Sequence, residues 1–220
     1  MIKFEDIHKK YKNADYEVLS GLNLEISNGE FIHLKGRKGK STVLHFIYLM
    51  DRPTSGKVFY GEKELNKLKF NFQRAKIRRK IGYVDQDLWL LDDRTVYENI
   101  KISTDLLKMK SKERKERVEE IMEYFELGSI RKHKIGQLSY QEKILVELSR
   151  ELVKKPEVLI LDEVFEKLKR DNKDKLLKHL YKINEEGTTV IAVTSEEKLF
   201  DERIRVIDLD GGKTDVESDE

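Results

Sequence analysis

The chain has 220 residues, which is enough for one large α/β domain with a substantial buried core. Its 44 Lys and Arg residues are balanced by 42 Asp and Glu residues, and the net charge of +2 excludes a global attraction to nucleic acid or anionic lipid. The absence of cysteine excludes a disulfide framework and a thiolate zinc site. No apolar run approaches the roughly 20 residues that span a bilayer, so we expect a cytoplasmic protein.

The start of the chain predicts antiparallel strands. Apolar residues alternate at residues 2–4 and again at residues 22–26, and the turn signal Asn28-Gly29 follows the second group. Tyr11 falls in the loop between these strands. By itself this pattern makes Tyr11 a partly buried turn aromatic.

Residues 31–50, FIHLKGRKGKSTVLHFIYLM, place an apolar strand, a tight glycine turn and an apolar helix end to end. This order is typical of a phosphate site, because helix-start amides and the helix dipole converge at the turn. The residues at that point are Gly39, Lys40, Ser41 and Thr42. Lys40 can reach an oxyanion, and the Ser41 hydroxyl can hold Mg2+. The usual spacing is G-x-x-x-x-G-K-[ST], but only two residues separate Gly36 from Gly39, so the loop is two residues short.

Residues 67–80, KLKFNFQRAKIRRK, contain seven basic residues and no acidic one, with Phe70 and Phe72 among them. The commoner explanation is a solvated helix face, and contact with RNA or phosphate head groups is the alternative. Residues 81–84 then predict a strand that leads to Gln86 and to the apolar cluster LWLL. Exposed Trp and Leu often mark a docking surface, while a capped core is the competing interpretation.

The middle of the chain has a highly charged helical pattern at residues 96–127, which predicts a helical subdomain at about residues 96–150 inserted into the α/β body. Ser139 can cap a further helix at residues 141–153, whose apolar residues fall on one face.

An apolar strand at residues 158–161 ends in Asp162 and Glu163, and its continuous apolar pattern predicts burial on both faces. The elements expected next are a helix at residues 172–186, a β-branched strand at residues 188–193 and a strand at residues 203–209. The acidic residues 215–220 predict a disordered tail. We therefore expect a single domain over residues 1–214.

This order of elements is typical of the P-loop nucleoside triphosphatase fold. Residues 81–100, IGYVDQDLWLLDDRTVYENI, closely resemble the Gln-loop region of ABC-type ATPases. The likeness is greatest to the ATPase subunit of the cell-division complex FtsEX and to the lipoprotein-release and macrolide-export ATPases near it. It runs over residues 2–212 and includes RPTSG at residues 52–56 and LVKKPEVLILDE at residues 152–163. It implies an ABC-type nucleotide-binding domain with an antiparallel β subdomain and an inserted helical subdomain.

The resemblance implies a role for each matched residue. Tyr11 would stack on adenine, and Glu163 would act as general base toward the attacking water. The other implied nucleotide-binding residues are Gly36, Gly39, Lys40, Ser41, Thr42 and Gln86, with Leu138 and Ser139 in the signature segment. Mg2+ would be held by Ser41, Gln86 and Asp162. These groups suit phosphoryl transfer, which needs positive charge on the phosphate oxygens and one acceptor that orients water.

Four motifs depart from the family pattern. The chain has G-R-K-G-K-S-T where the family has G-x-S-G-x-G-K-S-T, and losing two amide hydrogen bonds to phosphate costs roughly 3 to 6 kcal/mol, or about 100- to 10,000-fold in affinity. The signature L-S-G-G-E has Tyr140 and Gln141 in place of both glycines, which obstructs close approach to a γ-phosphate on an opposite subunit. Residues 164–169 read VFEKLK, without the family's Pro-Thr and Leu-Asp. Ser195 replaces the switch histidine and cannot shuttle a proton in the same way.

The resemblance implies a subunit that binds ATP and Mg2+ and drives an integral membrane partner in cell division or export. An FtsX-like permease would dock near residues 86–98 and hold the chain at the inner face of the cell membrane, and a homodimer is compatible with this role. Because four motifs are altered, we expect impaired ATP hydrolysis. The alternative is a pseudo-ATPase that docks without turnover. A nucleic-acid role based on residues 67–80 is the least favoured hypothesis, and we expect no nucleic-acid partner.

Overall fold

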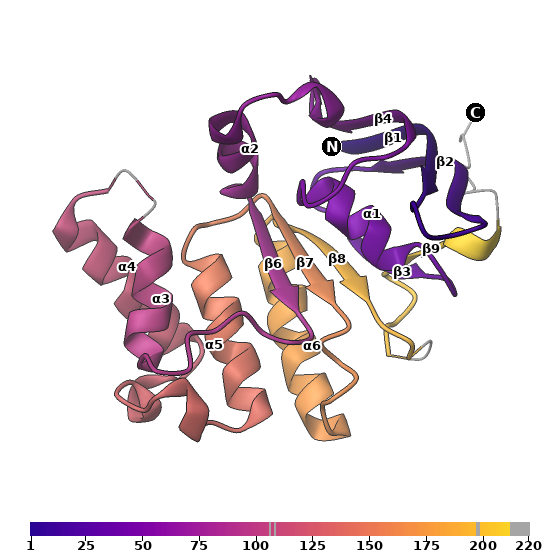
Figure 1. Ribbon diagram of the computed structural model, residues 1–220. Coiled ribbons are helices and arrows are strands. Elements are labelled where there is room, and N and C mark those ends of the chain that lie inside the picture. The colour runs from indigo at the N-terminus through magenta and orange to yellow at the C-terminus, as the bar shows by residue number, and fades with distance from the viewer. Residues whose placement is uncertain (106, 108, 197–198, 212–220) are drawn as a thin grey trace.

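A computed structural model describes residues 1–105, 107, 109–196 and 199–211 (Figure 1). The expected disordered tail at residues 215–220 lies outside the described residues. No helix in the described part of the chain is long and apolar enough to cross a membrane.

The first sheet is antiparallel and has the strand order β2-β1-β4-β5, as the alternating pattern at the start of the chain predicts. Its strands are β1 (Ile2–Lys10), β2 (Glu17–Ile26), β4 (Ser55–Tyr60) and β5 (Lys63–Glu64). Strand β1 pairs with both β2 and β4. The 3-10 turn at Leu65–Lys67 and helix α2 (Asn71–Arg78) then connect this sheet to the second one.

The second sheet has the order β6-β7-β8-β3-β9, and its neighbouring strands pair in parallel. Its strands are β3 (Phe31–Lys35), β6 (Ile81–Asp85), β7 (Val158–Asp162), β8 (Thr189–Val193) and β9 (Arg205–Asp208). Because the strands are parallel, their carboxyl ends meet at one edge of the sheet. The loop after β3 and the Asp-Glu pair after β7 are therefore brought to the same edge.

Two hydrophobic cores cover the two faces of the parallel sheet. Helix α1 (Lys40–Ile47) and the antiparallel sheet cover one face, and the helices that follow β6 cover the other. Along β7, Val158 and Ile160 belong to the first core, and Leu159 and Leu161 belong to the second. This alternation confirms that the continuous apolar pattern of β7 marks a strand buried on both faces.

The helices of the second face are α3 (Val96–Asp105), α4 (Ser111–Tyr124), α5 (Tyr140–Leu152) and α6 (Arg170–Glu185). Figure 1 shows α3 and α4 together at the side of the parallel sheet, with α5 between them and α6. Ser139 caps α5 as predicted, since its hydroxyl accepts a bond from the Glu142 amide at 3.3 Å, while the Ser139 amide donates to the Glu142 carboxylate at 2.8 Å.

Candidate functional site

The loop after β3 is shaped by two glycines. Gly39 has φ 87° and begins α1, and a Cβ placed there would lie 2.6 Å from Cδ2 of Leu19. Gly36 has φ 141°, and its Cβ would lie 3.0 Å from Cβ of Leu209. Residues with a side chain rarely adopt these positive φ angles, so both positions favour glycine. The loop therefore turns sharply from the strand edge into the amino-terminal end of α1, which carries a partial positive charge.

Lys40 lies at the first position of α1 and folds back over this loop, where its ammonium group donates to the Gly36 carbonyl at 2.6 Å. The neighbouring Ser41 hydroxyl lies 3.5 Å from Oδ1 of Asp162 at the end of β7. The structure thus brings together three of the predicted residues. A hydroxyl and a carboxylate are hard oxygen donors of the kind that Mg2+ prefers, so this pair fits a divalent cation.

Asp162 is buried, and its second oxygen accepts a hydrogen bond of 2.7 Å from the Tyr83 hydroxyl. Burial raises the pKa of Asp162 above its ordinary value, while the Tyr83 hydrogen bond opposes this shift. Sequence reasoning missed Tyr83, because an aromatic residue in the middle of a buried strand is indistinguishable from ordinary core. The register of β6 and β7, which places Tyr83 opposite Ile160, is the information that the pattern lacked.

Glu163 follows directly and has a left-handed backbone, with φ 54°. Its amide donates to the Val193 carbonyl at 3.1 Å, which ties the turn after β7 to the end of β8. Burial first, and then the charges of Glu166 and Asp162, raise the pKa of Glu163, while Lys40 lowers it. A carboxylate with a raised pKa is better suited to accept a proton from water than an ordinary surface carboxylate.

Tyr11 lies across the start of α1. Its hydroxyl is 3.2 Å from the Thr42 hydroxyl, and the Lys9 ammonium lies 4.7 Å from the centre of its ring. The side chain remains partly exposed. Tyr11 therefore lies at the start of α1, next to the phosphate loop of residues 36–39.

Gln86 is joined to the signature segment of the same chain through its backbone carbonyl. This oxygen accepts a hydrogen bond of 3.0 Å from the Tyr140 hydroxyl and one of 3.5 Å from the Lys167 ammonium. Lys167 also lies 5.5 Å from the Tyr140 ring and 3.6 Å from the Asp87 carboxylate. Sequence reasoning identified Tyr140 as an obstruction but missed this contact, because a side chain's partner across two loops leaves no periodic signal.

Ser195 is bound to Glu166 within the chain. The Ser195 amide and hydroxyl lie 2.9 and 3.4 Å from one Glu166 carboxylate oxygen. The other Glu166 oxygen is buried and has no hydrogen-bond partner among the described residues. The remaining signature residues are structural here: Leu138 packs against the second core, and Ser139 caps α5.

Arg37 is held by the carboxyl end of the described chain. Its amide donates to Oδ2 of Asp210 at 2.8 Å, and its guanidinium nitrogen Nε lies 3.3 Å from the same oxygen. One of the few amides of the short loop is thus occupied by a carboxylate.

The apolar segment after Gln86 contains Trp89, which is both exposed to solvent and packed against the sheet. The Trp89 side chain is 43% exposed, yet its ring stacks on Tyr83 with centroids 5.4 Å apart and planes 6° apart. The Arg150 guanidinium donates to the Trp89 carbonyl. Trp89 therefore has one packed face and one exposed edge. Its packed face contacts Tyr83, the residue whose hydroxyl donates to Asp162.

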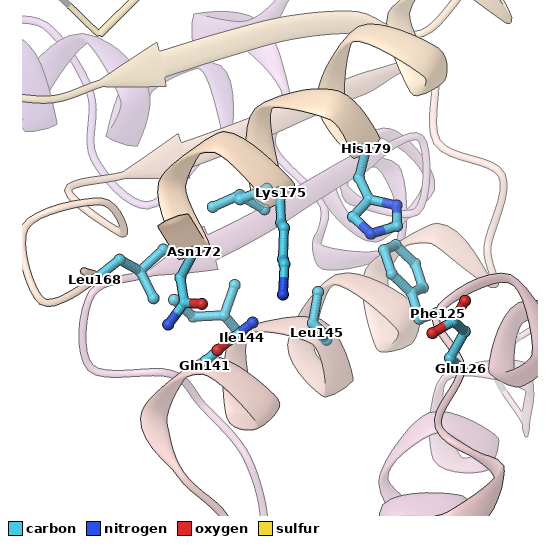
Figure 2. Close-up of a pocket in the computed structure, with 10 residues that line it drawn as sticks. Phe125, Glu126, Gln141, Ile144, Leu145, Leu168, Asn172, Lys175 and His179 are labelled. Carbon is cyan, nitrogen blue, oxygen red and sulfur yellow. The ribbon is translucent and has the colours of Figure 1, made fainter. Parts of the chain in front are cut away.

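A separate cavity of about 220 Å3 lies between α5 and α6. Figure 2 shows Gln141 and Leu145 of α5 facing Lys175 and His179 of α6 across it. Its lining does not include Lys40, Ser41, Asp162 or Glu163. We place the candidate site at the phosphate loop, because the convergent charged groups lie there.

Comparisons with known proteins identify relatives that match most of the chain. A family model described as ABC transporter matches residues 19–166. The chain is 33% identical over 215 residues to the cell division ATP-binding protein FtsE of Bacillus subtilis, covering 96% of this chain and 93% of the relative. It is also 33% identical over 215 residues to the lipoprotein-releasing system ATP-binding protein LolD of Aquifex aeolicus, covering 97% and 95% of the two chains.

Two solved structures are similar along most of their length. A dimeric bacterial ABC transporter cassette, MJ0796, superposes with a TM-score of 0.83 at 33% identity over 95% of each chain. A dimeric post-hydrolysis state of the same cassette bound to ADP and Pi has a TM-score of 0.81 at 32% identity, covering 90% of each chain.

Proposed function

The chain belongs to the ABC transporter family of ATP-binding subunits, and from this membership we propose that it binds ATP with Mg2+ and works with an integral membrane partner. The observation that carries the proposal is the convergence of Lys40, Ser41 and Asp162 at one edge of the parallel sheet. The ADP and Pi of a cassette with the same fold support nucleotide as the ligand. The FtsE and LolD relatives support an FtsX-like permease or a related membrane protein as the partner.

In this proposal each residue of the site has a definite task. Lys40 exchanges the Gly36 carbonyl for a phosphate oxygen, and the amides at the start of α1 donate to the same group. Ser41 and Asp162 hold Mg2+, which would neutralise phosphate charge when bound. Gln86 lies beside the site at the end of β6, and Glu163 orients the attacking water and accepts its proton.

We further propose that turnover is impaired while binding is retained. The loop provides few free amides, since it is two residues short and the Arg37 amide bonds to Asp210. Tyr140 replaces the first signature glycine, and its hydroxyl bonds to the Gln86 carbonyl of its own chain, so a bulky ring stands where the family has no side chain. Ser195 supplies no imidazole beside Glu163. A slow ATPase is the form of this proposal that we favour.

Calorimetric titration with Mg-ATP, combined with thermal unfolding, tests nucleotide binding. We expect Mg-ATP to raise the melting temperature, because a ligand at about 100 times its Kd stabilises the folded state by about 2.7 kcal/mol. Glu163→Gln should preserve this shift and abolish phosphate release, and Lys40→Ala should remove the shift. The absence of both heat and stabilisation at millimolar Mg-ATP would contradict the binding proposal.

A pseudo-ATPase that docks on its membrane partner without turnover is the second candidate function. The loss of the signature glycines and of the switch histidine favours it. Steady-state phosphate release in the presence of the membrane partner separates the two forms. Release that is abolished by Glu163→Gln supports the slow ATPase, whereas binding without any release above that of Glu163→Gln supports the pseudo-ATPase.

For the docking surface near residues 86–98, Trp89 is the residue to change. Trp89→Ala removes the exposed edge and should weaken capture by the membrane partner in detergent about tenfold or more, since buried aromatic anchors contribute about 2 kcal/mol. Tyr16→Ala is a matched control, because Tyr16 is also an exposed aromatic residue and lies outside residues 86–98. Unchanged capture by Trp89→Ala would assign Trp89 to the core.

A further inference from the structure

One face of helix α2 lines a cleft of about 440 Å3 outside the nucleotide site. The lining residues of α2 recur at intervals of three and four, so they share a single helical face. They are Asn71, Arg74, Ala75, Arg78 and Arg79. Tyr48, just beyond α1, and Lys154, just beyond α5, form the opposite wall. Lys154 is paired with Glu151, so the unpaired positive charge of the cleft lies on the α2 side.

The arginines of this cleft have neutral partners. Arg74 donates to the Leu49 carbonyl, and Arg78 donates to the Leu49 carbonyl at 2.7 Å and to the Tyr48 carbonyl at 3.0 Å. A carbonyl satisfies the N–H groups without cancelling the charge. Among the described residues, no ion pair is recorded for Arg74, Arg78 or Arg79.

The surrounding charge is also unbalanced. Within residues 67–80, Lys67 pairs with Glu64 at 2.6 Å and Lys80 pairs with Glu157 at 2.5 Å. The other five basic residues of the segment make no recorded ion pair within the described chain, and the segment contains no acidic residue. Burial and the nearby Arg78 and Arg52 lower the pKa of Arg74, as is expected where like charges crowd together.

An exposed aromatic pair stands at the amino-terminal end of the same helix. The Phe70 side chain is 58% exposed and the Phe72 side chain is 71% exposed. Their rings stack with centroids 5.6 Å apart and planes 16° apart. Exposing two large apolar side chains to water costs free energy in an isolated protein. Such side chains next to a cationic cleft are typical of a surface that enters a lipid interface.

We propose that residues 67–80, the α2 surface, bind anionic phospholipid directly. The arginine cleft receives the headgroup phosphate, for which planar guanidinium groups are well suited. Phe70 and Phe72 enter the boundary between headgroups and acyl chains. Lipid explains both the charge and the aromatic pair, whereas an acidic peptide explains only the charge, and for RNA bases one face of each phenyl ring is already covered by the other ring.

This lipid contact adds to the proposed attachment through a membrane partner and is independent of nucleotide. It therefore does not fail if ATP binding fails. It also accounts for the basic stretch that the nucleotide site leaves unexplained, and it requires only a local excess of positive charge, in agreement with the small net charge of the whole chain.

Vesicle cosedimentation with the full chain tests the proposal. Vesicles of phosphatidylcholine mixed with phosphatidylglycerol should sediment the protein, and pure phosphatidylcholine vesicles should not. Lys76→Gln with Arg79→Gln changes two exposed side chains and should weaken binding about 25-fold, or about fivefold for each charge removed. Lys112→Gln with Lys115→Gln removes the same charge from an exposed part of α4 and should leave binding unchanged.

A second pair of variants tests the aromatic contribution. Phe70→Ser with Phe72→Ser keeps every charge and should abolish the binding that persists at high salt, where the electrostatic part is screened. Melting curves should show that both double variants fold, because the substituted side chains are exposed.

Four outcomes would overturn the proposal. The first is equal binding to neutral and anionic vesicles, and the second is an equal loss of vesicle binding in the α2 and α4 double variants. The third is unchanged high-salt vesicle binding by the variant with Phe70→Ser and Phe72→Ser. The fourth is tighter binding to an RNA oligonucleotide or a glutamate-rich peptide than to the anionic vesicles.

Discussion

The two halves of the nucleotide face differ in what their functional side chains contact. In the phosphate half, Ser41 and Asp162 from separate elements face each other, and Lys40 lies over the loop between them. In the signature half, Tyr140 bonds to the backbone of the chain's own Gln86 and Ser195 bonds to Glu166. In the proposed function, the groups that hold the nucleotide and the groups that complete its turnover are carried by different elements, so one set can be retained while the other is replaced.

The helices of the two halves, α1 and α5, differ in the polarity of their buried residues. The buried residues of α1 are apolar except for Thr42. Those of α5 include Glu147 and Glu151, whose charges are met by Arg150 and Lys154. An apolar helix contributes to stability at every pH, whereas buried carboxylates make stability depend on protonation. The contribution of α1 to stability therefore depends less on pH than that of α5.

Restoring the length of the phosphate loop should change the affinity for Mg-ATP more than any other substitution in either half. Insertion of two small residues between Arg37 and Lys38 adds two amides to the loop, and we expect the affinity for Mg-ATP to rise about 100- to 10,000-fold. Calorimetric titration measures this change. Two glycines inserted instead after Glu62, in the exposed turn between β4 and β5, provide a control for loop insertion in general. An unchanged affinity would show that the short loop is not the cause of weak binding.

The sequence predicted the fold because periodicity and turn chemistry are local. The buried strand β7, the cap at Ser139 and the helix that was expected at residues 141–153 and found at Tyr140–Leu152 are all encoded within a few neighbouring residues. The meeting of Ser41 and Asp162 was implied by the family resemblance, and the parallel strands, which align their carboxyl ends, account for it physically. Contacts such as Tyr83 with Asp162, Tyr140 with Gln86 and Arg37 with Asp210 depend on register and loop paths, which leave no pattern in the sequence.

The buried carboxylate of Glu147 makes the stability of α5 depend on pH. Glu147 is fully buried, and one of its oxygens has no hydrogen-bond partner among the described residues. Burial raises its pKa from 4.5 to about 7 despite the ion pair with Arg150. Between these values the unfolded chain releases a proton that the folded chain keeps, so the free energy of unfolding falls as pH rises through this window. Above the window the loss is constant and amounts to about 3 kcal/mol at most.

Glu147→Gln removes this titration. Its free energy of unfolding relative to that of the unsubstituted chain should therefore increase from acid to neutral pH, and urea unfolding at several pH values measures the difference. Glu120→Gln, on the exposed side of α4, should show no such trend. A difference that stays flat across the window would mean that Arg150 keeps Glu147 ionised in the folded state, and that α5 is as robust as α1.

The smallest expected effect concerns Asp210, a carboxylate that contacts the phosphate loop. Asp210 accepts the Arg37 amide at 2.8 Å, so it occupies a donor of the loop and places negative charge where phosphate would bind. Asp210→Asn removes that charge and should raise the affinity for Mg-ATP about two- to fivefold, because a charge interaction at a partly exposed position is worth about 1 kcal/mol or less. The gain should shrink as salt is added, whereas Asp93→Asn, at an exposed site in the loop before α3, should have no effect. A lower affinity would mean that Asp210 holds the short loop in its binding conformation, and the phosphate half would then depend on an anchor of its own, as the signature half does.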